Sequence, residues 1–278
     1  MALAYHAEGS TTFAAAAWSD ATGFAAGATL VVDSLGAQNI VTSVDQSGVA
    51  AISYLSVSRN FSGNIGTAAS PLKFEASTEF RNDAAGGTIY WESKSSDVDP
   101  DVTALYTHTG PSTGNLVGGT VTQVQQAAGY VNVGQSTIIT TVRQCGGNSF
   151  YDYNATAITN LYMMGGTCYC KRQITNFYIY GGNLIYDVIA TVTSGFVGPD
   201  GSFDHRGGDI TTLEVGGAYT VQSLRRAATI GGTSFTVWAG SDVQRTSRGT
   251  VVATFSNETK IAGGQSTSSG GAFGGGGA

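Results

Sequence analysis

The chain repeats one short phrase several times, and this repeat limits its fold more than any other feature. An Ile-Thr-(Thr/Asn)-(Val/Leu/Phe) stretch followed by Gly-Gly begins at Ile139, Ile158 and Ile174, and a copy one residue shorter begins at Ile210. The copies are 19, 16 and 36 residues apart, and the last spacing is close to two units of 18. Self-similarity at a short, nearly fixed period is typical of stacked structural units.

Each copy consists of a predicted strand, a turn and a second strand. The first stretch alternates apolar and polar residues, which sends the apolar ones to one face. The Gly-Gly pair permits a positive φ and a tight turn, and runs such as Asn183-Leu-Ile-Tyr186 then begin another strand. We therefore predict a single-stranded parallel β-helix (β-solenoid) with coils of roughly 16–20 residues, whose stacking buries a continuous core.

Other folds compete with this prediction. An antiparallel sandwich also has strands bounded by turns, but it does not repeat one phrase in register. Repeats that contain helices need longer units. Disorder would explain the 40 glycines in 278 residues, but 41% of the chain is hydrophobic and 10% is aromatic. Only 12% of the residues are charged, which leaves little material for solvated helix faces. The composition thus favours an all-β protein.

The organisation along the chain follows from the repeat. Residues 1–30 are rich in Ala and contain Trp18, and we expect them to form an N-terminal cap or arm. Residues 31–262 are predicted to form the solenoid, with polar loops at 93–115 and 195–208. Residues 263–278 are a Gly/Ser-rich tail in which Phe273 is a candidate anchor to neighbouring chains.

The charge balance bears on the partners. The formal net charge is −6, and the densest basic run is Arg225-Arg226, so nucleic acid is not an expected partner. No apolar tract is long enough to suggest a membrane span, and the first residues do not resemble a secretion signal. We expect the cysteines, Cys145, Cys168 and Cys170, to be free thiols, because a metal site needs more ligands nearby.

Two groups of titratable residues are candidates for a site. Asp97, Asp99 and Asp101 alternate in a spacing that Ca²⁺ sites use, but the Gly and Glu of a complete calcium loop are missing. Asp204-His205-Arg206, with Asp200 and Asp209 close by, is the densest group of titratable residues. On a loop this group could hold a carboxylate pair for glycan cleavage, form an ion-pair cluster or bind a partner. We expect no catalytic, cofactor or metal site, and treat both groups and Phe273 as candidate partner-binding residues.

The many tyrosines between residues 151 and 186 suggest either a sugar-binding platform or a structural stack. Tyr162 and Tyr178 occupy equivalent places in successive copies, so we expect them to lie above one another and to stabilise the solenoid. An ice-binding surface would need a regular Thr-x-Thr ladder, and Thr120-Val-Thr122 and Thr191-Val-Thr193 do not recur in every copy.

A series of early segments, in this order, carries a family resemblance: Trp18, Gly27-Ala-Thr-Leu-Val-Val-Asp33, Asp45-Gln-Ser47, Leu55-Ser-Val57 and Phe61-Ser-Gly-Asn-Ile-Gly66. Together with the Gly-Gly coils, the series resembles parallel β-helix virion proteins of tailed bacteriophages, which decorate heads or form fibres and spikes. The resemblance covers roughly residues 18–240, and its motifs are turns and strands. It carries over no catalytic residue.

This resemblance implies a non-enzymatic structural protein of the virion, assembled in the host cytoplasm. The expected role is capsid decoration or cement, with the major capsid protein or other virion proteins as partners and a homo-oligomer, by analogy a trimer. The alternative is a glycan-binding or glycan-cleaving spike or fibre that recognises the host surface. A third hypothesis is a self-standing adhesin exported by a dedicated system.

Overall fold

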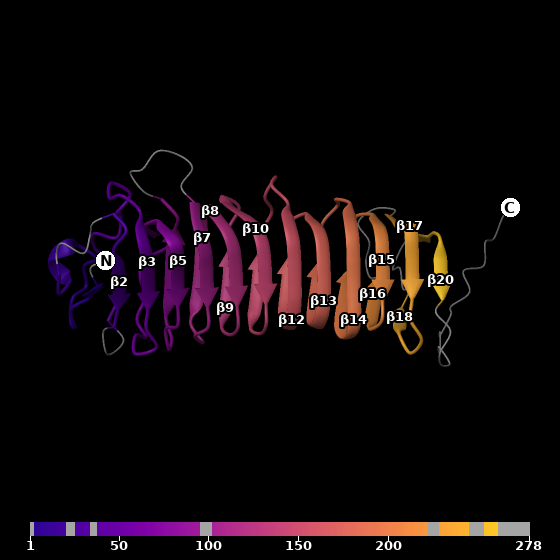
Figure 1. Ribbon diagram of the computed structural model, residues 1–278, viewed down its shortest axis with the longest axis horizontal. Helices are drawn as coiled ribbons and strands as arrows, with labels where there is room; N and C mark the ends of the chain where they lie inside the picture. Colours follow the sequence, from indigo (N-terminus) through magenta and orange to yellow (C-terminus); the bar gives the residue numbers. More distant parts are fainter. Residues whose placement is uncertain are drawn as a thin grey trace.

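The computed structural model describes residues 3–20, 26–33, 38–94, 102–221, 228–244 and 253–260. In these ranges the strands form one continuous sheet and their ladders are parallel, as in the pairing of Val142 with Leu161 and of Leu161 with Phe177. The coils stack side by side along the long axis of the molecule (Figure 1), with the N-terminal coils at one end and the C-terminal strands at the other. The predicted parallel β-solenoid is therefore confirmed.

The strands in the first part of the chain are β1 (Leu3–Tyr5), β2 (Thr29–Val32), β3 (Ile52–Val57), β4 (Leu72–Lys73), β5 (Ala76–Asn82), β6 (Thr88–Glu92), β7 (Val102–His108), β8 (Thr113–Gln126), β9 (Tyr130–Val133) and β10 (Thr137–Gln144). Those that follow are β11 (Asn148–Tyr151), β12 (Ile158–Cys170), β13 (Ile174–Tyr186), β14 (Val192–His205), β15 (Ile210–Val215), β16 (Ala218–Val221), β17 (Ala228–Val237), β18 (Asp242–Gln244), β19 (Ala253–Phe255) and β20 (Glu258–Lys260). A single 3-10 turn, η1 (Ala15–Ala17), is the helical element of the described residues, where no helix is long and apolar enough to cross a membrane.

One inward-facing column runs through the stack and shows how much sequence each coil contains. Its members pair in register and are buried: Leu30, Leu55, Phe80, Tyr106, Val124, Val142, Leu161, Phe177, Gly195, Leu213 and Phe235. From Tyr106 to Leu213, each member follows the previous one at an interval within the predicted range. We call these the narrow coils.

The coils at the two ends are longer than predicted. Leu30, Leu55, Phe80 and Tyr106 also pair in register, but each interval between them exceeds the predicted range, and we call these coils the wide coils. The interval from Leu213 to Phe235 also exceeds the predicted range, but by fewer residues than the intervals of the wide coils. The wide coil between Leu55 and Phe80 contains an additional turn, in which Thr67 and Ser70 bond to each other, before the short strand β4. The repeat that predicted the coil length lies wholly in the narrow coils, so it carried no information on the ends.

The Gly-Gly pairs turn the chain as the sequence predicted. Gly147, Gly166 and Gly182, the second members of successive pairs, have φ between +70° and +84°. A Cβ built on Gly182 would lie 2.5 Å from the carbonyl oxygen of Gly166 in the preceding coil. The pairs therefore stack as closely packed corners that a side chain would force apart.

The four copies of the repeated phrase lie in register. Ile158 pairs with Ile174, and Ile210 pairs with Val192, which begins the coil between the third and fourth copies. This intervening coil contains a predicted loop, 195–208, and that prediction is wrong, because residues 192–205 form β14. Gly195 looked like a loop residue, but it makes room for the ring of Phe177. A Cβ there would lie 2.8 Å from Phe177 Cε1.

The predicted loop at 93–115 is also shorter than expected. Residues 102–108 form β7, which pairs with β5 and β8. Its inward positions include Thr103 and His108, whose polar side chains hid the strand pattern. Both are buried and hydrogen-bonded, His108 through its Nε2 atom to the carbonyl oxygen of Ser112 at 3.0 Å.

At the N-terminal end, β1 already pairs in parallel with β2, and the segment that follows it supplies the buried rings of Phe13 and Trp18. Their centroids are 5.1 Å apart in an edge-to-face contact. The division into a cap, a solenoid and a tail stays a prediction, and residues 263–278 lie outside the described ranges.

Candidate functional site

The predicted group of Asp204, His205 and Asp209 does not converge. Asp204 and His205 are neighbours in β14, so their side chains point to opposite sides of the strand. Asp204 faces outward and accepts hydrogen bonds from Arg206 Nε at 3.0 Å and Arg206 Nη2 at 2.6 Å. Asp209 accepts a hydrogen bond from the backbone N–H of Thr229 at 2.7 Å. Asp204 and Asp209 are thus each engaged in a hydrogen bond within the chain.

His205 is a core residue. It is fully buried, its Nε2–H donates to the carbonyl oxygen of Gly207 at 2.6 Å, and its Nδ1 accepts from the Tyr219 hydroxyl at 3.1 Å. The imidazole stacks on Phe203 with centroids 5.4 Å apart. Burial lowers the pKa of His205 to about 4, so the ring is neutral at physiological pH. Its role in this geometry is to hold a corner of the coil.

Buried polar groups hold other corners in the same way. Asn82, His108, Gln126 and Gln144 form an inward column in register, and all four are buried. Gln126 Nε2 donates to the carbonyl oxygen of Asn148 at 2.8 Å, and Gln144 Nε2 donates to that of Thr167 at 3.1 Å. These side chains satisfy carbonyl groups at the turns, where the strand ladder is interrupted.

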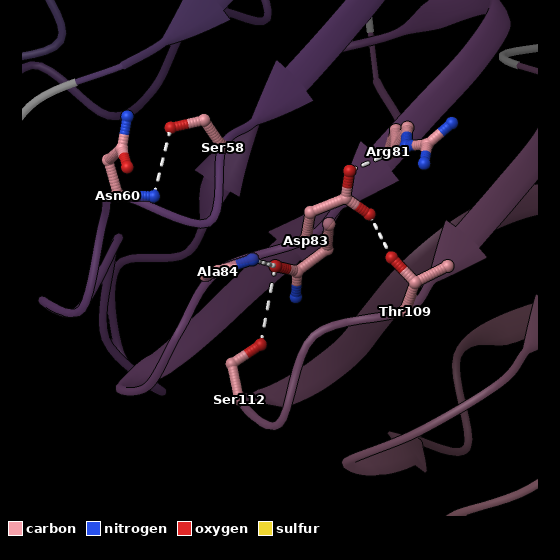
Figure 2. A network of polar contacts seen from close by, with 8 residues as sticks. Ser58, Asn60, Arg81, Asp83, Ala84, Thr109 and Ser112 are labelled. Atoms are coloured by element: carbon pink, nitrogen blue, oxygen red, sulfur yellow. Dashed lines mark hydrogen bonds and ion pairs between the residues drawn. The ribbon is translucent and has the colours of Figure 1, made fainter.

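A polar network lies at this column where the wide coils meet the narrow coils (Figure 2). Asp83 accepts hydrogen bonds from Arg81 and from Thr109 in the following coil, and Ser112 Oγ donates to Asn82 Oδ1 at 3.3 Å. The backbone N–H of Ala84 also donates to Asn82, at 3.1 Å. These contacts join two successive coils, so the network stabilises the stack and presents no convergent reactive group.

A cleft lies at one corner of the narrow coils. It has a volume of about 420 Å³ and is lined by the segments that follow the second strand of three coils: Tyr153, Asn154, Ala155, Lys171, Gln173, Asp187, Val188, Ile189 and Ala190. Two lining side chains are well exposed, Tyr153 at 62% and Ile189 at 49%. An exposed ring beside Lys171, Gln173 and Asp187 suits a small polar ligand that has an apolar face, such as a sugar.

An outer row of aromatic residues fixes one wall of this cleft. Phe150 and Tyr169 stack with centroids 5.5 Å apart and an interplanar angle of 11°. Lys171 Nζ lies 5.4 Å from the Phe150 centroid and 5.7 Å from that of Tyr169. The Tyr169 hydroxyl donates to Asp187 Oδ2 at 2.8 Å. Arg206, the partner of Asp204, also lies near this row, 5.9 Å from the Tyr169 centroid.

Between two lining residues, Arg172 points inward and is fully buried. Its guanidinium donates to the carbonyl oxygens of Thr137 at 2.7 Å, Gly134 at 3.0 Å and Asp152 at 3.2 Å. The floor of the cleft is thus attached to two preceding coils by one side chain. Charge-assisted hydrogen bonds of this kind are the strong ones, so we expect the cleft to be rigid.

Sequence reasoning missed the cleft. Its lining residues belong to no motif, and the signal that could have found them is the repeat itself. Residues 152–155, 171–173 and 187–190 each follow the second strand of successive coils, which places them at one corner. The predicted stack of Tyr162 on Tyr178 is confirmed, with centroids 5.0 Å apart, while Tyr151 and Tyr186 are core residues.

The other predicted residues fall outside the described ranges. Asp97, Asp99, Asp101 and Phe273 are among them, so calcium binding by the first three stays open. Within the described ranges, no three His, Cys, Asp or Glu side chains group in a way that could hold a metal ion. Cys168 and Cys170 are buried free thiols and Cys145 is an exposed one, as expected.

Comparisons with known proteins add no identity to this geometry. The chain gives no significant match to a protein-family model, to a curated protein or to a solved structure. The parallel β-solenoid therefore rests on the strand pairing described above. The resemblance to virion proteins of tailed bacteriophages stays a prediction.

Proposed function

We propose that this protein is a non-enzymatic structural component of a tailed-bacteriophage virion, where it decorates the capsid and binds the major capsid protein or other virion proteins. The family resemblance of its early segments suggests the virion, and with it assembly in the host cytoplasm. The proposal includes self-association of the chain.

The observation that carries the structural role is the in-register rows of outward side chains. Asn176 Nδ2 donates to Asn160 Oδ1 at 3.2 Å, Asn132 Nδ2 donates to Asn115 Oδ1 at 3.1 Å, and Tyr162 stacks on Tyr178. Each row repeats one kind of contact from coil to coil on a rigid flank. Such a flank suits a wide polar interface in which many small contacts add up.

The positions of the titratable groups support a role without catalysis. His205 is neutral and buried, Asp204 is paired with Arg206, and Asp209 bonds to the backbone of Thr229. A general acid and base must both reach one substrate bond. His205 points into the core and Asp204 points outward, so these two side chains do not reach one substrate bond.

The test is the position of the protein in purified virions, found by cryo-electron microscopy and by antibody labelling of the native chain. We expect one solenoid flank to lie on capsid subunits, and particles that lack the protein to lose resistance to heat or chelation. Density confined to the tail tip, or absence of the protein from the particle, would overturn the decoration role.

The cleft favours a second candidate function, glycan binding at the host surface. Tyr153 offers an exposed ring, and the partly exposed Lys171 and Gln173 offer an ammonium and an amide group beside it. The test is binding of purified host-surface polysaccharides by the full chain, with Tyr153→Ala as the variant and Tyr54→Ala, in the wide coils, as its control. Saturable binding that only Tyr153→Ala weakens would support this function, and no binding would exclude it.

A further inference from the structure

A second outer row crosses the narrow coils and differs from the rest of the surface. Arg143, Tyr162, Tyr178, Phe196 and Glu214 pair in register, one residue from each of five successive coils. The Arg143 guanidinium lies 5.3 Å from the Tyr162 centroid, and Glu214 Oε1 accepts from Trp238 Nε1 at 2.8 Å. The row is thus basic at one end, aromatic in the middle and acidic at the other end. We call it the Arg–Glu row.

Exposed apolar side chains widen the middle of this row. Met164 and Tyr180, two residues beyond Tyr162 and Tyr178 in their strands, are 59% and 49% exposed. Tyr180 contacts Phe196 with centroids 5.5 Å apart, and Phe196 contacts Trp238 at 6.1 Å. Contiguous exposed apolar side chains with a polar rim mark interaction surfaces. In this part of the chain, therefore, the flank is suited to a partner.

The order of charges identifies the kind of partner. Tyr178 is the central residue, with Arg143 two coils before it and Glu214 two coils after it. A second copy turned by 180° about an axis through Tyr178 therefore brings its own Glu214 opposite Arg143, and its Arg143 opposite Glu214. Copies that run in the same direction would place like charges together, which is unfavourable.

We propose that two copies of this chain pair face to face and antiparallel through the Arg–Glu row, with Tyr178 at the two-fold axis. A two-fold interface is self-complementary, because the same patch serves both subunits. The Tyr162 ring then packs near Phe196 of the partner subunit, and the two Tyr178 rings meet. The pairing needs no capsid, so it stands apart from the virion role, and it replaces the trimer that the resemblance implied.

The test is charge reversal on the full chain, with mass measured by analytical ultracentrifugation. We expect the native protein to form dimers, and Arg143→Glu or Glu214→Arg to raise the dissociation constant at least about tenfold, since each brings like charges together. The double variant, Arg143→Glu with Glu214→Arg, restores both pairs and should dimerise nearly as the native chain does. Arg59→Glu, at an exposed residue of the wide coils, is the matched control and should leave the dissociation constant unchanged.

Cross-linking tests the position of the axis. In a Cys145→Ser background, Tyr178→Cys should form a disulfide-linked dimer with itself. Tyr162→Cys should link to Phe196→Cys in a mixture of the two variants, but not to itself. Circular dichroism shows whether a charge reversal impairs folding. The cross-linking experiment tests the pairing even in that case, because the cysteine variants carry no charge reversal.

Several results would overturn the proposal. They are a native chain that stays monomeric or forms trimers, a double charge variant that is not restored, and self-linking of Tyr162→Cys in preference to Tyr178→Cys. A monomeric chain would also contradict the self-association included in the proposed function. None of these results bears on whether the chain lies on a capsid, so failure here leaves the decoration role to its own test.

Discussion

The wide coils and the narrow coils enclose different cores within the same stack. In the wide coils, the rings of Phe80 and Trp91 lie 4.8 Å apart, and Tyr106 stacks on Trp91 at 5.6 Å. In the narrow coils that follow directly, the equivalent column contains the shorter side chains of Val124, Val142 and Leu161, before a ring returns at Phe177. The backbone pairing is parallel in both regions, but the space inside differs.

At this boundary a wide coil holds aromatic rings where the next two coils hold valines. Because interiors pack to nearly constant density, the larger side chains accompany the longer coil at this point. At the junction, Tyr106 packs against Phe80 at 5.3 Å and continues into Val124 on the next coil. A repeat protein can thus change its girth within one continuous stack.

The largest expected effect comes from removing a ring of the wide core. Trp91→Ala should cost about 3–5 kcal/mol, because it leaves a cavity and removes the hydrogen bond from Trp91 Nε1 to the Phe74 carbonyl oxygen. The matched narrow-coil change, Leu161→Ala, should cost about 2–5 kcal/mol. Hydrogen exchange should show lost protection mainly in the region of each substitution, because coils contact only their neighbours. Loss spread evenly over both regions would show that they unfold as one unit.

The second effect is on pH dependence and concerns His205. Folding lowers its pKa from 6.5 to about 4, so between these values the unfolded chain binds a proton that the folded chain does not. The contribution of neutral His205 to the free energy of unfolding is complete above pH 6.5 and is lost as the pH falls toward 4. In denaturant titrations, native protein should lose about 2–3 kcal/mol more than His205→Gln between pH 7 and pH 4.5.

The same comparison can be made where the wide coils end. Burial also lowers the pKa of His108, so His108→Gln should reduce the acid sensitivity in the same direction. Equal pH dependence in the native protein and in both variants would contradict the assignment of these imidazoles as neutral core groups.

The third effect is the cost of replacing a corner glycine by alanine, which should differ between the two regions. The first glycine of a pair is crowded in the narrow coils, where a Cβ on Gly181 would lie 2.7 Å from the carbonyl oxygen of Met164. In the wide coils, a Cβ on Gly86 would lie 3.7 Å from Ser62, an ordinary contact. We expect Gly181→Ala to cost about 1–3 kcal/mol and Gly86→Ala to stay within about 0.5 kcal/mol of the native protein. Thermal melts of the two variants decide this, and equal shifts would refute the difference in crowding.

The smallest effect concerns the outer stack beside the cleft. A double-mutant cycle with Phe150→Ala and Tyr169→Ala should give a coupling of about 0.5–1.5 kcal/mol, as expected for stacked aromatic pairs. Phe150→Ala combined with Tyr54→Ala, in the wide coils, is the distant control and should be additive. A coupling near zero in the first cycle would mean that the stacked rings add no stability to the narrow coils.

The sequence predicted the fold where the repeat is clear. Ile158 and Ile174 begin successive copies of the repeated phrase and pair in the structure, and the stack of Tyr162 on Tyr178 follows from the same spacing. The wide coils could not be predicted in this way, because they contain no copy of the repeated phrase, and the turn at Thr67 and Ser70 lies in one of them. The length of a wide coil becomes clear only from the pairing of its inward side chains in the structure.

The candidate site was predicted less well, because it depends on where side chains point and not on the spacing of the repeat. Asp204 and His205 are adjacent in the chain, but a strand sends them to opposite faces, and His205 became a core residue. Gly195 looked like a loop residue because its function is to leave room for Phe177. The cleft joins Tyr153, Lys171 and Asp187, which come together only through the stacking of three coils.

The constant pairing of the inward column has a consequence for the dimensions of the molecule. Each coil adds one strand spacing, about 4.8 Å, to the length of the rod, whether the coil is narrow or wide. Additional residues in a coil therefore increase its thickness and leave its height unchanged. Insertions at corners such as Thr67–Ser70 can reshape the profile of the rod while two points far apart along its axis keep their separation.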